Sequence, residues 1–152
     1  MIDSHSELVL LYDAVVRLQG RLRESFAAAR AGSGLSDMEH TVLAAVVEAP
    51  RPPTVPQIGR ALGHPRQVIQ RAANALQDAG LVSPLPNPDH KRAALLVATD
   101  RGRAVQAEGN RKASRIAADL TRAVSAADVR EATRLLAAIR DGLSHPARKE
   151  AA

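Results

Sequence analysis

The sequence predicts a mainly α protein with one small β-hairpin, an α+β fold. Apolar residues recur at three- and four-residue spacing along most of the chain, which is the period of amphipathic helices. Two short apolar stretches, at 81–85 and 93–98, flank a proline-rich turn and have the length of paired strands. Aromatic residues make up only 1% of the chain, so we expect a core of closely packed helices built from Leu, Val, Ile and Ala.

Capping residues mark where the first two helices begin and end. The first predicted helix carries apolar residues from Leu8 to Phe26 and ends near Gly32. Ser36, followed three residues later by Glu39, forms a capping box that starts the second helix. The prolines that begin at position 50 end that helix and form a stiff connection to the next one.

Two further helices lie close together in the middle of the chain. Thr54 and Gln57 form another capping box, and Gly63 is suited to end the short helix that follows. Pro65 fits the first position of the next helix, which Gly80 ends after about four turns. Two helices joined by a short turn predict a helix-turn-helix motif.

The second helix of this motif has two different faces. Its apolar side chains should face the core: Val68, Ile69, Ala72 and Leu76. Its polar side chains include no carboxylate, and each can donate to a base edge or a phosphate: Arg66, Gln67, Gln70, Arg71 and Asn74. Most polar helix faces are simply solvated, so both interpretations stand, and the absence of Glu and Lys favours contact with DNA.

The turn between the two predicted strands is the second cationic feature. Pro86 and Pro88 prevent regular pairing at its tip and favour a projecting loop. Lys91 and Arg92, with His90 beside them, are suited to contact phosphate or a minor groove. Such a pair is usually only solvated, but directly after a helix-turn-helix it has the position of a wing.

Positive charge is concentrated in this middle segment. The net charge is +5, and the segment from Arg51 to Arg103 contains eight basic and three acidic residues, so the rest of the chain balances to zero. A localised basic surface attracts double-stranded DNA, and Thr54 and Gln57 are further candidates for phosphate contact. The lack of aromatic side chains argues against modules that bind single strands. An acidic protein partner would also be attracted, so a winged-helix protein-interaction module without specific DNA binding remains an alternative.

The order of these motifs resembles the MarR family of bacterial transcriptional regulators. The similarity runs from about Leu35 to Gly102, and its most specific parts are the Leu62-Gly63 turn, the helix exit at 79–82, the hairpin tip and the segment 99–102. The resemblance implies a winged helix-turn-helix module at 35–103 and helical dimerisation regions at 1–34 and 104–145. Residues 146–152 have the composition of a disordered tail.

The resemblance also implies how the chain works. It implies a homodimer that acts as a repressor by binding a pseudo-palindromic inverted repeat in double-stranded DNA. It also implies that a small-molecule effector releases the dimer from this operator. Helices at both ends carry apolar stripes that need cover, which independently favours pairing with a second copy. Half-sites about 34 Å apart would suit such a dimer.

The chain departs from the family pattern at two places. His90 stands where the family usually has an aspartate that anchors the wing-tip arginine, here Arg92, and Asp89 is the alternative anchor. Gln67 and Gln70 stand where serine and threonine are frequent, which implies a longer reach to bases and a different operator.

The resemblance places an effector in the crevice between the dimerisation helices and the winged helix. Six residues are candidates by position to line it: Tyr12, Val16, Met38, His40, Thr41 and Arg101. The alternative, which we favour for Met38 and His40, is that these side chains simply pack between helices.

Other classes of protein find little support in the sequence. The chain has no cysteine, and its five histidines lack the spacing of metal ligands, which leaves a metal sensor as a weaker hypothesis. Nucleophile-elbow, P-loop and dinucleotide-binding motifs are missing, so we expect neither an enzyme nor a bound cofactor. Without a signal sequence or an apolar run of about 18 residues, we expect a cytoplasmic protein that does not contact the membrane.

Overall fold

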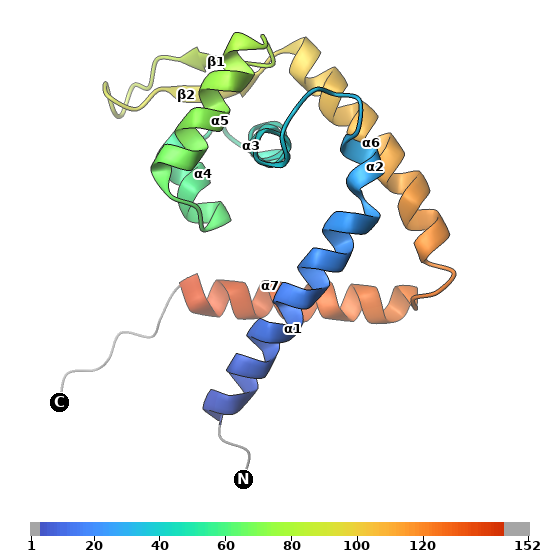
Figure 1. Cartoon of the computed structure of the whole chain (residues 1–152). Helices are drawn as coiled ribbons and strands as arrows, with labels where there is room; N and C mark the ends of the chain where they lie inside the picture. Colours follow the sequence, from blue (N-terminus) through green and yellow to red (C-terminus); the bar gives the residue numbers. More distant parts are fainter. Residues whose placement is uncertain (1–3, 145–152) are drawn as a thin grey trace, which may run out of the picture. The chain divides into compact units, whose positions relative to one another are not determined.

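The computed structural model describes residues 4–144, so the predicted tail at 146–152 lies outside the described residues. These residues form seven helices and one antiparallel hairpin, which confirms the predicted fold class (Figure 1). The elements are α1 (Ser4–Ser25), α2 (Ala27–Arg30), α3 (Asp37–Glu48), α4 (Val55–Leu62), α5 (Arg66–Asp78), β1 (Val82–Leu85), β2 (Leu95–Ala98), α6 (Asp100–Leu120) and α7 (Ala126–Ser144). They belong to two compact units that divide between Ser114 and Arg115.

The capping boxes predicted for α3 and α4 are both present. The Ser36 side chain accepts a hydrogen bond from the Glu39 N–H, and the Glu39 carboxylate accepts one from the Ser36 N–H. Thr54 and Gln57 make the same reciprocal pair at the start of α4. Gly63 adopts the left-handed conformation, with φ at 66°, that ends α4 and turns the chain into α5.

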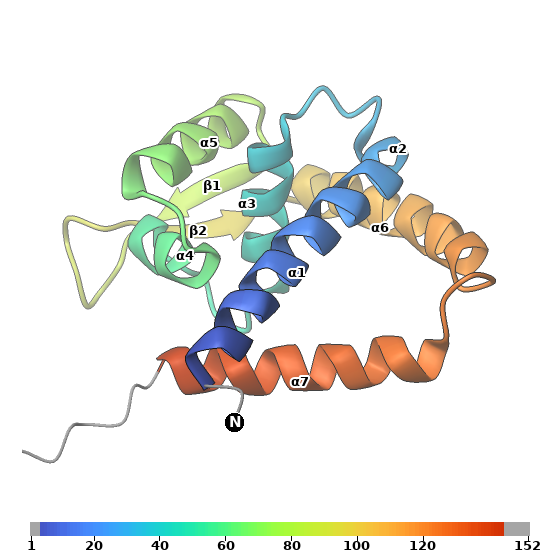
Figure 2. The ribbon, with the colours of Figure 1, turned by 60° about the horizontal axis from the view of Figure 1, so that its bottom comes forward.

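The core of the first unit lies between α3, α4, α5 and the hairpin (Figure 2). Its largest fully buried side chains are Leu43, Ile69, Leu76 and Val42. In the hairpin, Val82 lies opposite Ala98 at the open end, and Leu85 lies opposite Leu95 beside the loop. The core therefore holds α5 by one face and leaves the opposite face at the surface.

Two details differ from the expectations. The first helix breaks at Phe26 and resumes as the single turn α2, instead of continuing as one helix towards Gly32. The expectation that Val68 faces the core is wrong, because this side chain is 38% exposed. Ile69 and its neighbours one turn on occupy the core side of α5, and Val68 lies at the edge of that stripe.

A dense junction joins the end of α5, the hairpin and the start of α6. The Thr99 hydroxyl lies 2.8 Å from the Gly80 carbonyl and 3.2 Å from the Leu81 carbonyl, so it can donate to either. The same hydroxyl accepts from the Gly102 N–H at 3.0 Å, and the Thr99 N–H donates to the Leu81 carbonyl. Gly102 is buried, and a Cβ atom built on it would lie 2.0 Å from the Leu81 carbonyl oxygen. Only glycine fits at this contact.

Apolar side chains are exposed on α1 in the first unit and on α7 in the second. Those on α1 are Leu8, Val9, Leu10, Tyr12, Val15, Val16, Leu18 and Leu22. Those on α7 are Val129, Leu135, Leu136, Ile139 and Leu143. Charged side chains also lie on α7, where the Arg134 guanidinium donates to both oxygens of Glu131 and lowers the pKa of that carboxyl.

Candidate nucleic-acid interface

The polar face of α5 lies at the surface, as the sequence predicts. Arg66, Gln67, Arg71 and Asn74 are exposed and Gln70 is half-buried. The Gln70 side-chain amide donates to the Asn74 side-chain oxygen at 2.9 Å, so these two residues already satisfy part of each other's bonding capacity. The face is therefore accessible along its whole length.

The structure divides this face into two stripes. Arg66, Gln70 and Asn74, spaced four residues apart, line a hollow of about 240 Å³ between α5 and the hairpin. Gln77 from the last turn of α5 and Arg92 from the hairpin loop line the same hollow. Gln77 was not among the predicted site residues, because the C-terminal end of a helix gives no signal of its proximity to a hairpin later in the chain.

Gln67 and Arg71 form the second stripe and do not line the hollow. At about 100° per residue they lie nearly opposite the buried Ile69 and Leu76. Within the described part of the chain, neither side chain forms a hydrogen bond or an ion pair. The Gln67 amide and the Arg71 guanidinium are therefore available to donate to another molecule.

The loop between β1 and β2 projects beyond the body formed by α3, α4 and α5 (Figure 2). Its tip residues His90, Lys91 and Arg92 are all exposed. Asn87 shapes the loop, because its side chain donates to the Ala93 carbonyl at 2.9 Å and accepts from the Asp89 N–H at 3.0 Å. Among residues 4–144, Asp89 forms no ion pair with Arg92, so the alternative anchor for this arginine is not in use.

Thr54 and Gln57 differ in accessibility. Thr54 is only 7% exposed, and its hydroxyl and N–H are bonded to Gln57 inside the capping box. Burial therefore keeps the Thr54 hydroxyl in the cap and away from a phosphate. Gln57 is exposed, so of this pair it remains the candidate for contact with a DNA phosphate.

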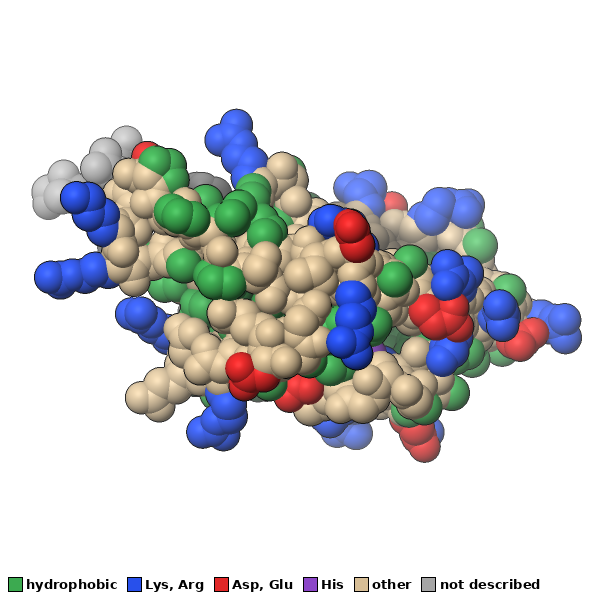
Figure 3. All heavy atoms as spheres, turned by 90° about the horizontal axis from the view of Figure 1, so that it is seen from above, with side chains coloured by type: hydrophobic (Ala, Val, Ile, Leu, Met, Phe, Trp, Pro, Cys, Tyr) green, Lys and Arg blue, Asp and Glu red, His purple; other side chains and the backbone are tan. Residues whose placement is uncertain are grey.

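Basic side chains dominate the charge of the surface. Figure 3 shows one face of the molecule, on which Lys and Arg side chains stand out at many points and carboxylates are fewer. The excess agrees with the net charge of +5. A surface of this sign attracts polyanions at long range.

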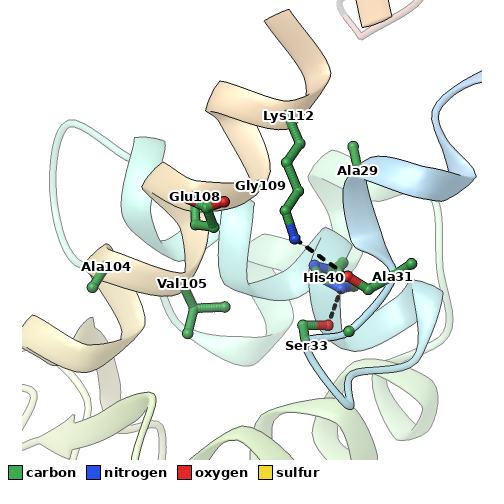
Figure 4. Close-up of a pocket in the computed structure, with 10 residues that line it drawn as sticks. Ala29, Ala31, Ser33, His40, Ala104, Val105, Glu108, Gly109 and Lys112 are labelled. Carbon is green, nitrogen blue, oxygen red and sulfur yellow. Dashed lines mark hydrogen bonds between the residues drawn. The ribbon is translucent and has the colours of Figure 1, made fainter. Parts of the chain in front are cut away.

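A second hollow, of about 310 Å³, lies between the loop after α2 and the first half of α6 (Figure 4). Its wall is largely small and apolar, and four polar side chains line it: Ser33, His40, Glu108 and Lys112. The Glu108 carboxylate is paired with Arg111. The His40 Nε2 atom lies 2.7 Å from the Ser33 Oγ, and the Lys112 Nζ donates to the Ala31 carbonyl at 3.5 Å.

Of the six effector candidates, the structure brings only His40 to this hollow. The other five have different positions. Tyr12 and Val16 are exposed on α1, Met38 packs against the core, Thr41 donates to the Asp37 carbonyl, and Arg101 donates to the Ala79 carbonyl. Ser33 and Lys112 were missed by the sequence reasoning, because the hollow joins segments 81 positions apart.

Among residues 4–144, no three potential ligands from His, Asp and Glu come together to hold a metal ion. No helix in that range has the length and apolar composition needed to cross a membrane.

Comparison with known proteins agrees with this architecture. The MarR family model matches residues 33–93. An uncharacterized protein of Mycobacterium tuberculosis is 40% identical over 99 residues, which cover 65% of this chain and 68% of that protein. The transcriptional repressor CouR, solved bound to a 23-mer DNA duplex, is 28% identical with a TM-score of 0.73, over 92% of this chain and 97% of CouR. A mutant MarR from E. coli in complex with operator DNA shares the fold at 20% identity and a TM-score of 0.72, over 90% and 98% of the two chains.

The helix-turn-helix, the hairpin wing and the helices around them define a winged-helix transcriptional-regulator fold. The chain belongs to the MarR family.

Proposed function

We propose that this chain is a sequence-specific DNA-binding regulator that binds an inverted-repeat operator as a homodimer and acts as a ligand-responsive repressor. One observation carries the proposal: the exposed face of α5 from Arg66 to Asn74 has no carboxylate and lies beside a wing that exposes Lys91 and Arg92. The CouR structure supports it, because that repressor is bound to a DNA duplex and resembles this chain over nearly its whole length.

Binding to duplex DNA across a salt series tests the proposal. The probe is an inverted repeat that the wild-type protein selects from a random-sequence duplex library, compared with a scrambled duplex of the same composition. We expect saturable binding to the repeat, with an affinity that falls linearly on a log–log plot against salt concentration. Weak, sequence-independent binding that is lost by about 150 mM salt would favour the protein-interaction module instead.

Replacing Lys91 by alanine is expected to weaken binding to the repeat and to the scrambled duplex alike. A lysine at the wing tip that neutralises one phosphate releases about 0.9 counterion, so the salt slope should become shallower by about that amount per protomer. Arg122→Ala removes the same charge from an exposed position in the second unit and should leave the slope unchanged. A Lys91→Ala protein with the wild-type slope would exclude the wing from the interface.

The homodimer is supported by the exposed apolar side chains of α1 and of α7. Each helix leaves a hydrophobic stripe open to water, which is the usual mark of a surface that another molecule covers. We assign the pairing to the predicted regions 1–34 and 104–145. A two-fold dimer would then present two copies of α5 to an inverted repeat.

Ligand response is supported by the hollow beside α6. Its volume is at the lower end of the range of about 300–1,000 Å³ for small-molecule sites, and its wall is apolar with a few polar groups at one end. The Lys112 ammonium, whose hydrogen bond to the Ala31 carbonyl is long, favours a molecule with one anionic group. The one carboxylate in the lining, that of Glu108, is paired with Arg111.

Thermal unfolding with a panel of small carboxylates and their neutral amides tests this assignment. A carboxylate that enters the hollow should raise the Tm of the wild type, since a ligand of the folded state stabilises it by mass action. The same compound should raise the Tm of Lys112→Met much less, because the variant keeps the apolar stem and loses the charge. Equal stabilisation by acid and amide, or of both proteins, would contradict the role of Lys112.

A further inference from the structure

We propose that the hollow between α5 and the wing is a binding site for one phosphodiester of the DNA backbone, with Arg66 and Arg92 as its two cationic groups. Recognition of bases then falls to Gln67 and Arg71. The inference rests on the proposed function and refines it, because the sequence leaves each polar side chain of α5 as a candidate for either a base edge or a phosphate. It divides that face into a part that positions the protein and a part that selects the sequence.

The composition of the hollow fits a phosphodiester. Arg66 reaches it from the first turn of α5, and Arg92 reaches it from the hairpin loop. None of the residues that line it is acidic. Neither arginine forms an ion pair within the described residues, so both guanidinium groups are available. Two arginines converging from separate elements suit the tetrahedral oxygens of a phosphate.

Three side-chain amides also line the hollow. Gln70, Asn74 and Gln77 line it along one stripe of α5, and the first two are bonded to each other at 2.9 Å. Amide N–H groups are common donors to phosphate oxygens, and they add no sequence selectivity there. Gln70 and Asn74 are also less free to adjust to a base edge, because each already holds the other.

The geometry of DNA explains why a phosphate should lie at this place. A helix in the major groove and a wing in the neighbouring minor groove lie on opposite sides of one sugar–phosphate strand. That strand must pass between the two protein elements. In this chain the space between α5 and the wing is the hollow, and it is lined by Arg66 on one side and Arg92 on the other.

The outward stripe has the properties expected of residues that contact bases. Gln67 and Arg71 lie nearly opposite the buried side of α5, so they project furthest towards the floor of a major groove. Both side chains are exposed and unbonded within the described residues. Arg matches the O6/N7 edge of guanine and Gln matches the N6/N7 edge of adenine.

A double-mutant cycle between protein and DNA tests the assignment. The probe is the inverted repeat selected by the wild type, made with a neutral methylphosphonate at one linkage at a time. For the wild type, we expect one linkage per half-site, between the two grooves, at which neutralisation weakens binding about tenfold. For Arg66→Gln, the same neutralisation should cause a clearly smaller further loss, because one of the two charges that the phosphate meets is gone.

The base-contacting residues should behave in the opposite way. Gln67→Ala and Arg71→Ala should keep the full methylphosphonate effect and lower the ratio of operator to scrambled affinity about tenfold. Arg66→Gln should lower both affinities alike and reduce the salt slope by about 0.9 per protomer. Arg122→Gln is the matched loss of charge at a residue that does not line the hollow, and it should change none of these quantities.

The possible outcomes separate this inference from the proposed function. A wild-type protein that does not distinguish the selected repeat from the scrambled duplex would overturn both. A wild-type protein that does distinguish them, with an Arg66→Gln variant that changes its base preference and keeps its methylphosphonate sensitivity, would overturn only the phosphate site. A reduced sensitivity of Arg66→Gln at the linkage between the grooves supports it.

Discussion

Gly102→Ala is expected to destabilise the protein by more than about 3 kcal/mol, at the upper end of overpacking effects. A Cβ atom at this position would lie 2.0 Å from the Leu81 carbonyl oxygen and 3.4 Å from the Leu43 Cδ1. The oxygen belongs to the backbone and accepts from the Thr99 N–H, so it cannot move without breaking the junction. For a chain of this size the loss corresponds to a fall in Tm on the order of 10 °C, measured by circular dichroism.

Gly109→Ala is the matched control in the same helix. The nearest atom to a Cβ there is the Ala29 carbonyl oxygen at 3.9 Å, an ordinary contact. Alanine is the better helix former by about 1 kcal/mol, so this variant should be as stable as the wild type or slightly more stable. Equal Tm values for Gly102→Ala and Gly109→Ala would show that the close contact between α6 and Leu81 is not present in solution.

Leu18→Glu is expected to raise the dissociation constant of the homodimer at least about a hundredfold. Leu18 is 48% exposed on α1, in the apolar stripe that we assign to the dimer interface. An unpaired carboxylate buried at an interface costs several kcal/mol. Sedimentation equilibrium measures the change directly, and the monomer should also lose its affinity for the inverted repeat, since each half-site would bind alone.

Gln19→Glu introduces the same charge one position further along α1, where the wild-type side chain is polar and exposed. It should leave the dimer intact. If both variants dimerise like the wild type, α1 is not part of the interface. If Leu18→Glu stays dimeric and loses DNA binding, the apolar stripe has another role.

Local signals in the sequence predict most of the fold. The Ser36–Glu39 and Thr54–Gln57 pairs fix helix starts because a capping box needs only residues three apart. Gly63 fixes a helix end because the left-handed conformation excludes most other residues. The polar face of α5 is predictable for the same reason, since helical spacing alone separates it from the buried side.

The remaining features depend on contacts between distant segments. The division of α5 into two stripes follows from where the wing folds back, and the turn at 86–94 contains no signal of that direction. The hollow beside α6 brings Lys112 to Ala31, 81 positions away, so no spacing in the sequence reveals it. Thr54 is a candidate for phosphate contact by its position at the start of a helix, and no local signal shows that it is buried. It is buried because β2 lies against it, through the bridge between Thr54 and Leu95.

The junction at Thr99 also has a mechanical consequence. A helix of 21 residues such as α6 is about 31 Å long, so a tilt of roughly 5° moves its far end by nearly 3 Å. At the start of α6, the Thr99 hydroxyl bonds to the Gly80 carbonyl, and Gly102 packs directly against the Leu81 carbonyl. These contacts connect α6 to the residues that follow α5. Because the Gly102 contact is so close, the start of α6 and the end of α5 cannot slide past each other. We therefore expect a change of angle at the start of α6 to move the last residues of α5 with it.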